Sequence, residues 1–229
     1  MPIFIDAAQE GTKPCLINVE GIAAISFHEE IERYPSYINV SYANGASDRL
    51  INYSNREQSF DLEDIAAKLA SEGVEFLRDQ EGCLFFPQSV VYIKYCPNDG
   101  PHNTPQLAIG VLSTEREMLI KGTQQELEAV VAKISANRSF MAFDMEQTSY
   151  TNAANPTKIY VDTSAVRLIR DQPYFVIVRF DDYRPELSFN VNIKAGIKDA
   201  PVNASEAFKA AVEKQKEIER ASLKPLAIE

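Results

Sequence analysis

The sequence predicts an α+β protein made of three tandem repeats, each an antiparallel four-stranded meander followed by an amphipathic helix, with the three units packed together. Two observations lead to this prediction: an apolar signature that occurs three times, and a helical apolar stripe that follows each signature. The units are predicted over residues 1–73, 74–137 and 138–229. Units of this size bury only a marginal core alone, so we expect them to pack on one another.

The signature is a large apolar residue, a small residue four positions later, and then two aliphatic residues three positions apart. It occurs in the segments LINVEGIAAI, LFFPQSVVYI and IYVDTSAVRLI. The aligned residues are Ile17, Phe85 and Val161; Gly21, Ser89 and Ala165; Ile22, Val90 and Val166; and Ile25, Ile93 and Ile169. Short runs rich in β-branched residues are typical of buried strands, so each signature is predicted to be a strand.

Two further strands are expected between each signature and the helix that follows it. The dipeptide Asn44-Gly45 is the clearest turn signal, because it favours a tight β-hairpin. The predicted strand pairs are 37–42 with 49–53, 106–112 with 117–121, and 174–180 with 187–193. A short apolar segment ahead of each signature, at 4–6, 76–78 and 142–144, is interpreted as one more strand.

Each unit is predicted to end in a helix whose apolar residues are spaced i, i+3, i+4, i+7 and therefore share one face. The three stripes are Leu62, Ile65, Ala66 and Leu69; Leu127, Val130, Val131 and Ile134; and Phe208, Ala211, Val212 and Gln215. Thr123 with Glu126 is a capping box for the second helix. Asp61 and Gly73 are expected at the start and the end of the first helix.

The charge balance argues against a nucleic-acid partner. The 229 residues include 23 Lys and Arg against 33 Asp and Glu, a net charge of -10, whereas a phosphate backbone is bound through Lys and Arg that displace counterions. The N-terminal segment does not have the pattern of a signal peptide, and no 18 consecutive residues are apolar. We therefore expect an acidic protein with no membrane partner and a cytoplasmic location. The three cysteines lack CxxC spacing, which indicates reduced thiols.

The motifs of common enzymes are missing from the sequence. The segment His28-Glu29-Glu30 begins like a zinc-protease motif but lacks the second histidine four positions after the first. Cys96 and His102 lie in one loop, a spacing that prescribes no geometry for a zinc site or a thiol nucleophile. GxSxG, Walker and GxGxxG patterns are also absent. We expect a non-enzymatic protein without cofactor or metal, with a hydrolase based on carboxylate or Tyr side chains as the alternative.

The candidate binding residues lie in loops, which commonly carry binding groups on a repeated scaffold. The loops after the signatures differ most between units, and side-by-side packing would bring their polar side chains to one rim. These side chains are His28, Arg33, Tyr34, Asp99 and His102. A predicted hairpin tip adds Asp181, Asp182 and Arg184; its two aspartates could bind a cation, but the segment lacks the ligand spacing of a calcium loop. Plain solvent-exposed loops are the alternative interpretation of both groups.

The last helix continues beyond its apolar stripe to Ile218, and the tail at 224–229 contains Leu226 and Ile228. Such a helix and tail could dock on a second subunit, which predicts a homo-oligomer; packing on their own unit is the alternative. The sequence therefore favours a cytoplasmic binding protein that presents a composite surface of three units to a protein partner. A small-ligand binding protein for a nucleotide or metabolite, and a self-assembling ring or shell component, are the alternatives.

Overall fold

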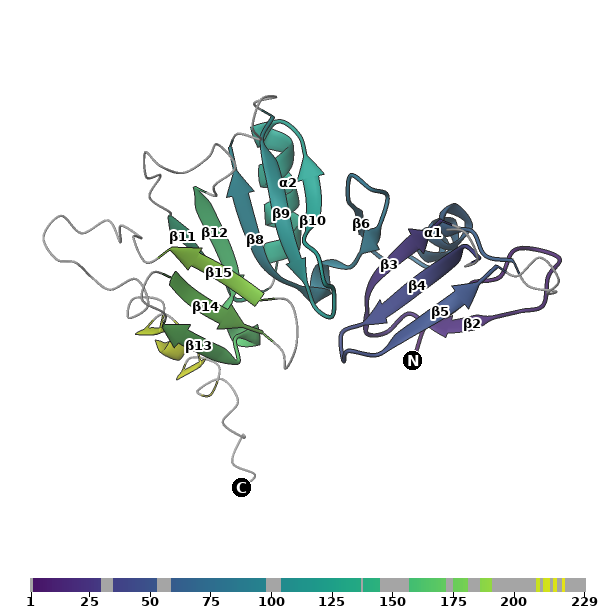
Figure 1. The fold of residues 1–229 in the computed structure, drawn as a ribbon, viewed down its shortest axis with the longest axis horizontal. Coiled ribbons are helices and arrows are strands. Elements are labelled where there is room, and N and C mark those ends of the chain that lie inside the picture. Colours follow the sequence, from purple (N-terminus) through teal and green to yellow (C-terminus); the bar gives the residue numbers. More distant parts are fainter. Residues whose placement is uncertain are drawn as a thin grey trace, which may run out of the picture. The chain divides into compact units, whose positions relative to one another are not determined.

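The computed structural model describes residues 2–29, 35–52, 59–97, 104–136, 138–144, 157–171, 175–180 and 186–190, with 209–210, 212–214, 216–217 and 220 of a last helix. This part of the chain mixes sheets and helices, and its strands pair antiparallel (Figure 1). The chain divides into two compact units, residues 1–90 with 110–120 and residues 91–109 with 121–229, which are described separately. None of the described helices is long and apolar enough to cross a membrane.

Five short strands precede each of the two fully described helices. The elements are β1 (Phe4–Asp6), β2 (Leu16–Asn18), β3 (Ile22–His28), β4 (Tyr37–Tyr42), β5 (Ser47–Ile51), α1 (Leu62–Ser71), β6 (Leu77–Arg78), β7 (Leu84–Phe85), β8 (Val90–Cys96), β9 (Gln106–Val111), β10 (Met118–Lys121), α2 (Gln124–Ser135), β11 (Phe140–Asp144), β12 (Lys158–Asp162), β13 (Leu168–Asp171), β14 (Phe175–Arg179) and β15 (Glu186–Asn190). Short 3-10 turns, Pro87–Ser89 and Thr163–Ala165, precede β8 and β13. The predicted hairpin strands and the first two helices are therefore confirmed in position.

The strands of the described residues form four sheets instead of three separate meanders. Their orders are β1-β2, β5-β4-β3-β7-β6, β10-β9-β8-β12-β11 and β13-β14-β15. A four-stranded meander is thus not the observed unit. Strand β7 pairs with β3, and β12 pairs with β8, so each of these strands lies beside a strand that is not its neighbour in the sequence. The number of repeats remains a prediction.

Each signature is two strands with a turn between them, and not the single strand that was predicted. In the first signature the chain turns at Glu20 and Gly21, and the φ of +81° at Gly21 is a conformation that glycine adopts without strain. The same backbone hydrogen bond closes all three turns. It runs from Ile22 N to Val19 O (3.3 Å), from Val90 N to Pro87 O, and from Val166 N to Thr163 O (3.4 Å). The large residue and the aliphatic pair therefore lie on different strands.

Helix α1 begins and ends at the residues expected from the sequence. The Asp61 side chain accepts a hydrogen bond from Asp64 N at 2.9 Å, which satisfies one of the free N–H groups of the first turn. At the other end, Gly73 has a φ of +71°, and its N–H donates to Ala70 O while that of Val74 donates to Leu69 O. These two bonds are the Schellman motif, which satisfies the last carbonyls of the helix.

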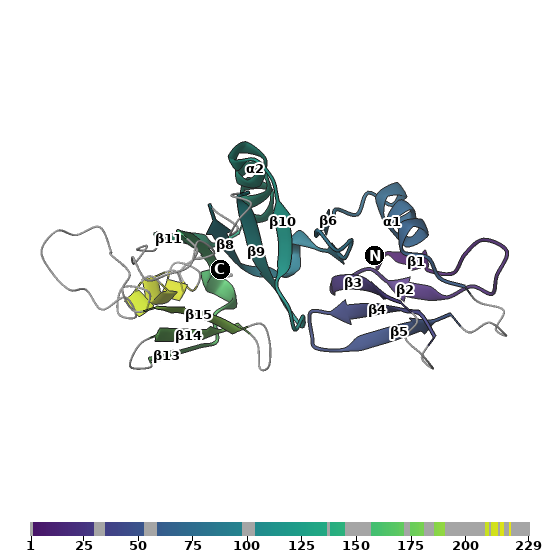
Figure 2. The same ribbon diagram turned by 45° about the horizontal axis from the view of Figure 1, so that its top comes forward.

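The core of the first unit lies between α1, the β1-β2 hairpin and the sheet that contains β3 and β4. Figure 2 shows α1 and the hairpin beside the strands β3–β5. Its buried residues are Ile5, Ala7, Ala8, Ile17, Val19, Ile22, Ile25, Ile38, Val40, Leu50, Phe60, Ile65, Ala66, Leu69, Leu84 and Phe86. The predicted apolar face of the first helix therefore supplies Ile65, Ala66 and Leu69 to this core.

In the second unit, α2 carries the predicted capping box: the Thr123 side chain accepts from Glu126 N, and the Glu126 carboxylate accepts from Thr123 N at 2.8 Å. Leu127 and Ile134 of its stripe are buried. The ring centres of Tyr92 and Phe180 lie 5.6 Å apart in the same unit. The described residues of the last helix, 209–210, 212–214, 216–217 and 220, are helical, and Val212 is buried as its place in the stripe predicts.

Candidate functional site

Of the eight residues that the sequence singles out, the described part of the chain contains one, His28. Outside it lie Arg33, Tyr34, Asp99, His102, Asp181, Asp182 and Arg184. The predicted common rim is therefore represented by His28 alone, and the cation site at the third hairpin tip falls entirely outside the described residues. The tail with Leu226 and Ile228 also falls outside them.

His28 lies at the exposed end of β3, where two neighbours fix its ring. Its Nε2 atom is 3.0 Å from the Ser26 hydroxyl oxygen, two positions earlier on the same face of the strand. Its ring stacks on the ring of Tyr37, with the two centres 4.6 Å apart and the planes at 10°. Partial desolvation lowers the pKa of His28, and the positive charges of Arg116 and Arg49 lower it further. These influences therefore favour the neutral form of the imidazole.

Tyr37 extends this cluster onto the neighbouring strands. It pairs with His28 across the β3–β4 ladder, and the Arg49 guanidinium on β5 lies over its ring, 5.3 Å from the ring centre. Cations at this distance are attracted by the negative face of an aromatic ring. Asn39 pairs with both Ser26 and Arg49, so these five side chains come from one face of three adjacent strands. We call Ser26, His28, Tyr37, Asn39 and Arg49 the β3–β5 patch.

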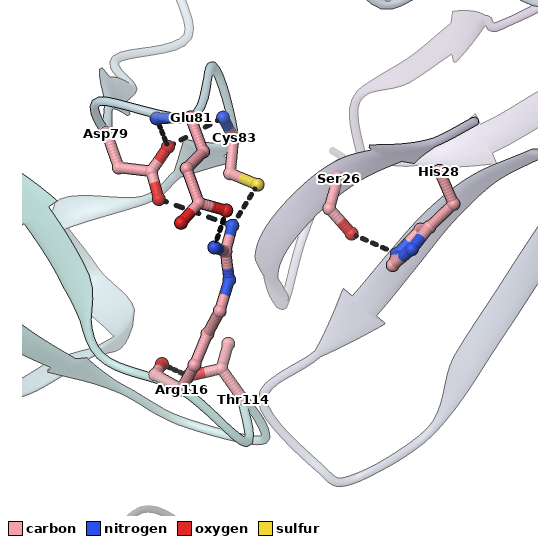
Figure 3. A network of polar contacts seen from close by, with 7 residues as sticks. All are labelled: Ser26, His28, Asp79, Glu81, Cys83, Thr114 and Arg116. Carbon is pink, nitrogen blue, oxygen red and sulfur yellow. Dashed lines mark hydrogen bonds and ion pairs between the residues drawn. The ribbon is translucent and has the colours of Figure 1, made fainter.

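A second polar cluster in the same unit is centred on Arg116, which follows β9 in the chain (Figure 3). Its Nη2 atom lies 3.4 Å from Asp79 Oδ2 and 2.8 Å from Cys83 Sγ, and its Nη1 atom pairs with the Glu81 carboxylate. The other Asp79 oxygen accepts from the backbone N–H of Glu81 and of Cys83, each at 2.9 Å. Arg116 thus joins the loop after β9 to the turn between β6 and β7.

Burial controls ionisation in the Arg116 cluster. Desolvation raises the pKa of Asp79, whose side chain is 2% exposed, although its backbone hydrogen bonds and Arg116 oppose the shift. Desolvation, together with the charge of Asp79, raises the pKa of the Cys83 thiol to about 11. A thiol reacts as its thiolate, so Cys83 is a poor nucleophile at neutral pH. The contacts of the cluster are those of a structural clamp.

The described residues do not assemble a recognisable catalytic centre. Ser26 and His28 have the separation of a nucleophile and its base, but no carboxylate in the described part of the chain contacts the histidine to orient it. Desolvation also raises the pKa of Cys15. Among the residues that the structure describes, no three His, Cys, Asp or Glu side chains are arranged to hold a metal ion. What the β3–β5 patch offers is a set of polar and aromatic groups in which His28 and Arg49 are exposed and the others are half-buried.

Sequence reasoning found His28 but missed Tyr37, Arg49 and Arg116. The polar alternation of Tyr37, Asn39 and Ser41 along one predicted strand is a signal that could have located that face. Which residues of β3 and β5 lie beside Tyr37 depends on the register of the strand pairs. The Asn44-Gly45 turn limits the register of β4 and β5 but does not fix it. Nothing in the sequence connects Arg116 to Asp79, because the two belong to different loops.

Comparison of the chain with protein-family models, with curated proteins and with solved structures finds no match.

Proposed function

We propose that this chain is a non-enzymatic, cytoplasmic binding protein, made of three repeated units, that docks a protein partner on the β3–β5 patch. The observation that carries the proposal is the contact of exposed His28 and Arg49 with the half-buried ring of Tyr37 on one sheet face. Tyr and Arg are enriched among the residues that dominate protein interfaces, because each combines a large contact area with directed polar groups.

The proposed units are residues 1–73, 74–137 and 138–229, as the sequence predicts. The shared turn hydrogen bonds at Ile22, Val90 and Val166 support them, since these residues are aligned in the three signatures. A second parallel feature supports the first two units. The Asp6 carboxylate accepts from Ala8 N and Cys15 N, as the Asp79 carboxylate accepts from Glu81 N and Cys83 N. Each cysteine directly precedes the second strand of its hairpin, β2 or β7.

The geometry of the β3–β5 patch favours binding over catalysis. His28 and Arg49 are exposed, and both are held by contacts with Tyr37. Holding side chains in place before binding reduces the conformational entropy that an interface costs. A catalytic serine would instead need an oriented base, which Ser26 lacks within the described residues. A fluorophosphonate probe is therefore expected to leave Ser26 unmodified in the folded protein.

A comparison of variants tests the proposed surface. The chain and its Tyr37→Ser/Arg49→Glu variant would be used to retain proteins from an extract of the source cells, with quantification by mass spectrometry. The Lys13→Glu variant is the matched control, because it makes the same change of charge as Arg49→Glu on the exposed loop between β1 and β2. We expect a partner that the parent chain and the control retain and the double variant loses.

The proposal is wrong if the double variant, shown to be folded by circular dichroism, retains the same proteins in the same amounts as the parent chain. It is also wrong if pure chain hydrolyses ester or phosphate reporter substrates and loses that activity in a Ser26→Ala variant. The first outcome would show that the β3–β5 patch does not bind the partner, and the second would show that the chain is an enzyme.

A further inference from the structure

The sheet of the first unit is completed by a hairpin that comes later in the chain. Strand β7 of the β6-β7 hairpin pairs with β3, so that Phe85 lies opposite Ala24 and Leu84 opposite Ile25. The Phe86 N–H donates to Ala23 O at 3.1 Å next to this pair. The edge of β3 that faces away from β4 is therefore covered.

A second junction in the other unit has the same register. Strand β12 of the β11-β12 hairpin pairs with β8, with Val161 opposite Tyr92 and Tyr160 opposite Ile93. In the aligned signatures, Tyr92 corresponds to Ala24 and Val161 corresponds to Phe85. The two junctions therefore follow one rule: the hairpin that opens a repeat pairs with the first strand of the preceding three-stranded meander.

This rule leaves one hairpin and one meander without a junction partner among the described residues. The β1-β2 hairpin opens the first repeat and forms a sheet of its own, and the β13-β14-β15 sheet of the third repeat ends at β13. By alignment, β2 corresponds to β7 and β12, and β13 corresponds to β3 and β8. The chain thus carries one copy of each half of the junction.

The side chains at these two edges are exposed where their counterparts are buried. Leu16 on β2 is 67% exposed, whereas the aligned Leu84 on β7 is 0% exposed. Leu168 on β13 is 40% exposed, whereas the aligned Ala24 and Tyr92 are 4% and 2% exposed. Exposed apolar side chains on an unpaired strand edge are what strand addition by another chain would cover.

We infer that β2 of one copy of this protein pairs antiparallel with β13 of a second copy, in the register of the two internal junctions. Leu168 then lies opposite Ile17 of the other copy, and Ile169 lies opposite Leu16. The new ladder buries Leu16 and Leu168 and pairs the main-chain groups at both edges. This pairing is separate from the partner binding proposed above. It rests on the proposed repeat, because the repeat gives the alignment of β2 with β7 and β12.

The association is head-to-tail, because the two surfaces differ and each copy has one of each. Such an interface is not self-complementary, so it produces rings when the rotation between copies closes and open chains when it does not. The second copy is the occupant because each copy carries one β2 and one β13, the two matching halves of the junction, and Leu16 and Leu168 are each exposed on their own strand. The main-chain ladder provides affinity, and the apolar side chains fix the register.

Two single substitutions separate the two halves of this junction. Leu16→Glu places a charge on β2 and leaves β13 intact, and Leu168→Glu does the reverse. Measured by sedimentation velocity over a range of concentrations, the parent chain should form assemblies larger than a monomer. Each variant alone should be monomeric, with association weakened at least about tenfold, because the junction would bury an unpaired charge.

A mixture of the two variants gives the sharpest outcome. The intact β2 of Leu168→Glu can pair with the intact β13 of Leu16→Glu, so the mixture should form 1:1 dimers and nothing larger. Phe27→Glu is the matched control, since Phe27 is another large apolar side chain, 44% exposed, that lies outside the predicted ladder. This variant should associate like the parent chain.

Three results would overturn the inference. The first is a parent chain that stays monomeric up to about 1 mM, where even weak association becomes visible. The second is a monomeric mixture of the two variants when circular dichroism shows both to be folded. The third is association of either single variant alone at the strength of the parent chain. None of these results depends on the β3–β5 patch, so the failure of one proposal is distinguishable from failure of the other.

Discussion

The Nη2 atom of Arg116 lies 3.4 Å from Oδ2 of Asp79, a residue 37 positions earlier in the chain. The Asp79 side chain is 2% exposed and the Arg116 side chain 44% exposed, so the pair joins a buried acid to a base at the surface. Burying a carboxylate is unfavourable unless a cation and hydrogen bonds compensate it. The contact therefore stabilises the turn between β6 and β7, and with it the hairpin that completes the first sheet.

The first prediction is that Arg116→Met destabilises the protein. We expect a loss of about 1–2 kcal/mol in the free energy of unfolding, measured by urea denaturation, because a buried polar group would lose its charged partner. The exposure of Arg116 limits the loss, since solvent screens the pair. The control is Glu81→Gln, which changes the other acid beside Arg116; Glu81 is 58% exposed, so the expected change is below about 0.5 kcal/mol.

A double-mutant cycle tests whether Asp79 is the reason for that loss. Asp79→Asn keeps an oxygen that can accept from the Glu81 and Cys83 N–H groups but removes the charge. The effect of Arg116→Met should therefore be smaller in the Asp79→Asn background. Additivity within about 0.3–0.5 kcal/mol would show that the two side chains are not coupled.

The second prediction concerns stability in acid. The N–H groups of Cys15 and Ala8 donate to the Asp6 carboxylate, and the Cys15 bond is the main cause that lowers the pKa of Asp6 below its usual value of 3.8. Since the pKa of the folded state is the lower one, the stabilisation is present above 3.8 and is lost as the pH falls through the folded pKa. Urea denaturation between pH 2 and pH 7, values chosen to span this range, should show the loss.

Asp6→Asn should be less sensitive to acid than the parent chain over this range, because the amide oxygen can accept the same hydrogen bonds but does not titrate. Glu20→Gln, a change of an exposed carboxylate on the turn before β3, is the control and should follow the parent chain. Equal acid sensitivity of the parent chain and Asp6→Asn would contradict the role given to Asp6.

The positions of the elements were predictable because local rules determine them. The capping box of Thr123 and Glu126 and the positive φ of Gly73 are present in the structure as the sequence indicates. The Asn44-Gly45 turn also joins two strands, with Gly45 at a φ of +87°. Such signals act over a few residues, so a single sequence is enough to interpret them.

The arrangement of the sheets was not predictable in the same way. The signature segment from Ile17 to Ile25 is predicted to be one strand, because its apolar spacing does not show the turn that Gly21 permits. The pairing of Phe85 with Ala24 connects residues far apart in sequence, and only the folded chain shows it. The β3–β5 patch likewise depends on the register of three strands, so His28 was found without Tyr37 and Arg49.

The third prediction is that His28 titrates below its usual pKa of 6.5. Partial desolvation is the main cause, and the charges of Arg116 and Arg49 add to it. Because the pKa of the folded state is lowered, the unfolded chain takes up the proton first as the pH falls through 6.5, and protonation of His28 costs stability. A titration followed by nuclear magnetic resonance, with His28→Gln to assign the signal, measures the value.

Removing one of the two charges gives a matched comparison. Arg49→Gln should raise the pKa of His28 towards 6.5, whereas Arg78→Gln, a change in the same unit at a residue that is not among the causes of the shift, should leave it unchanged. A His28 pKa above 6.5 in the parent chain would mean that an acidic group faces the ring. Ser26 and His28 would then have to be reconsidered as a nucleophile and its base.

The fourth prediction concerns the thiol of Cys83, on which two opposite influences act. The Arg116 Nη2 atom lies 2.8 Å from its sulfur, and a cation at this distance favours a thiolate. Burial and the Asp79 charge favour the thiol, and they raise its pKa to about 11. We expect the second influence to prevail, because the cysteine is 4% exposed and Arg116 is already paired with two carboxylates.

Alkylation by iodoacetamide at pH 8, with the sites identified by mass spectrometry, distinguishes the two influences. Cys83 should react at least about tenfold more slowly in the folded chain than in urea, where all three cysteines should react at similar rates because thiolate content and access determine reactivity. Asp79→Asn removes one of the influences that raise the pKa of Cys83. It should increase the rate of Cys83 alkylation if the thiol is as accessible in the variant as in the parent chain. Rapid modification of Cys83 in the folded parent chain would instead identify a thiolate stabilised by Arg116, and the Arg116 cluster would then be a candidate reactive site in place of a structural clamp.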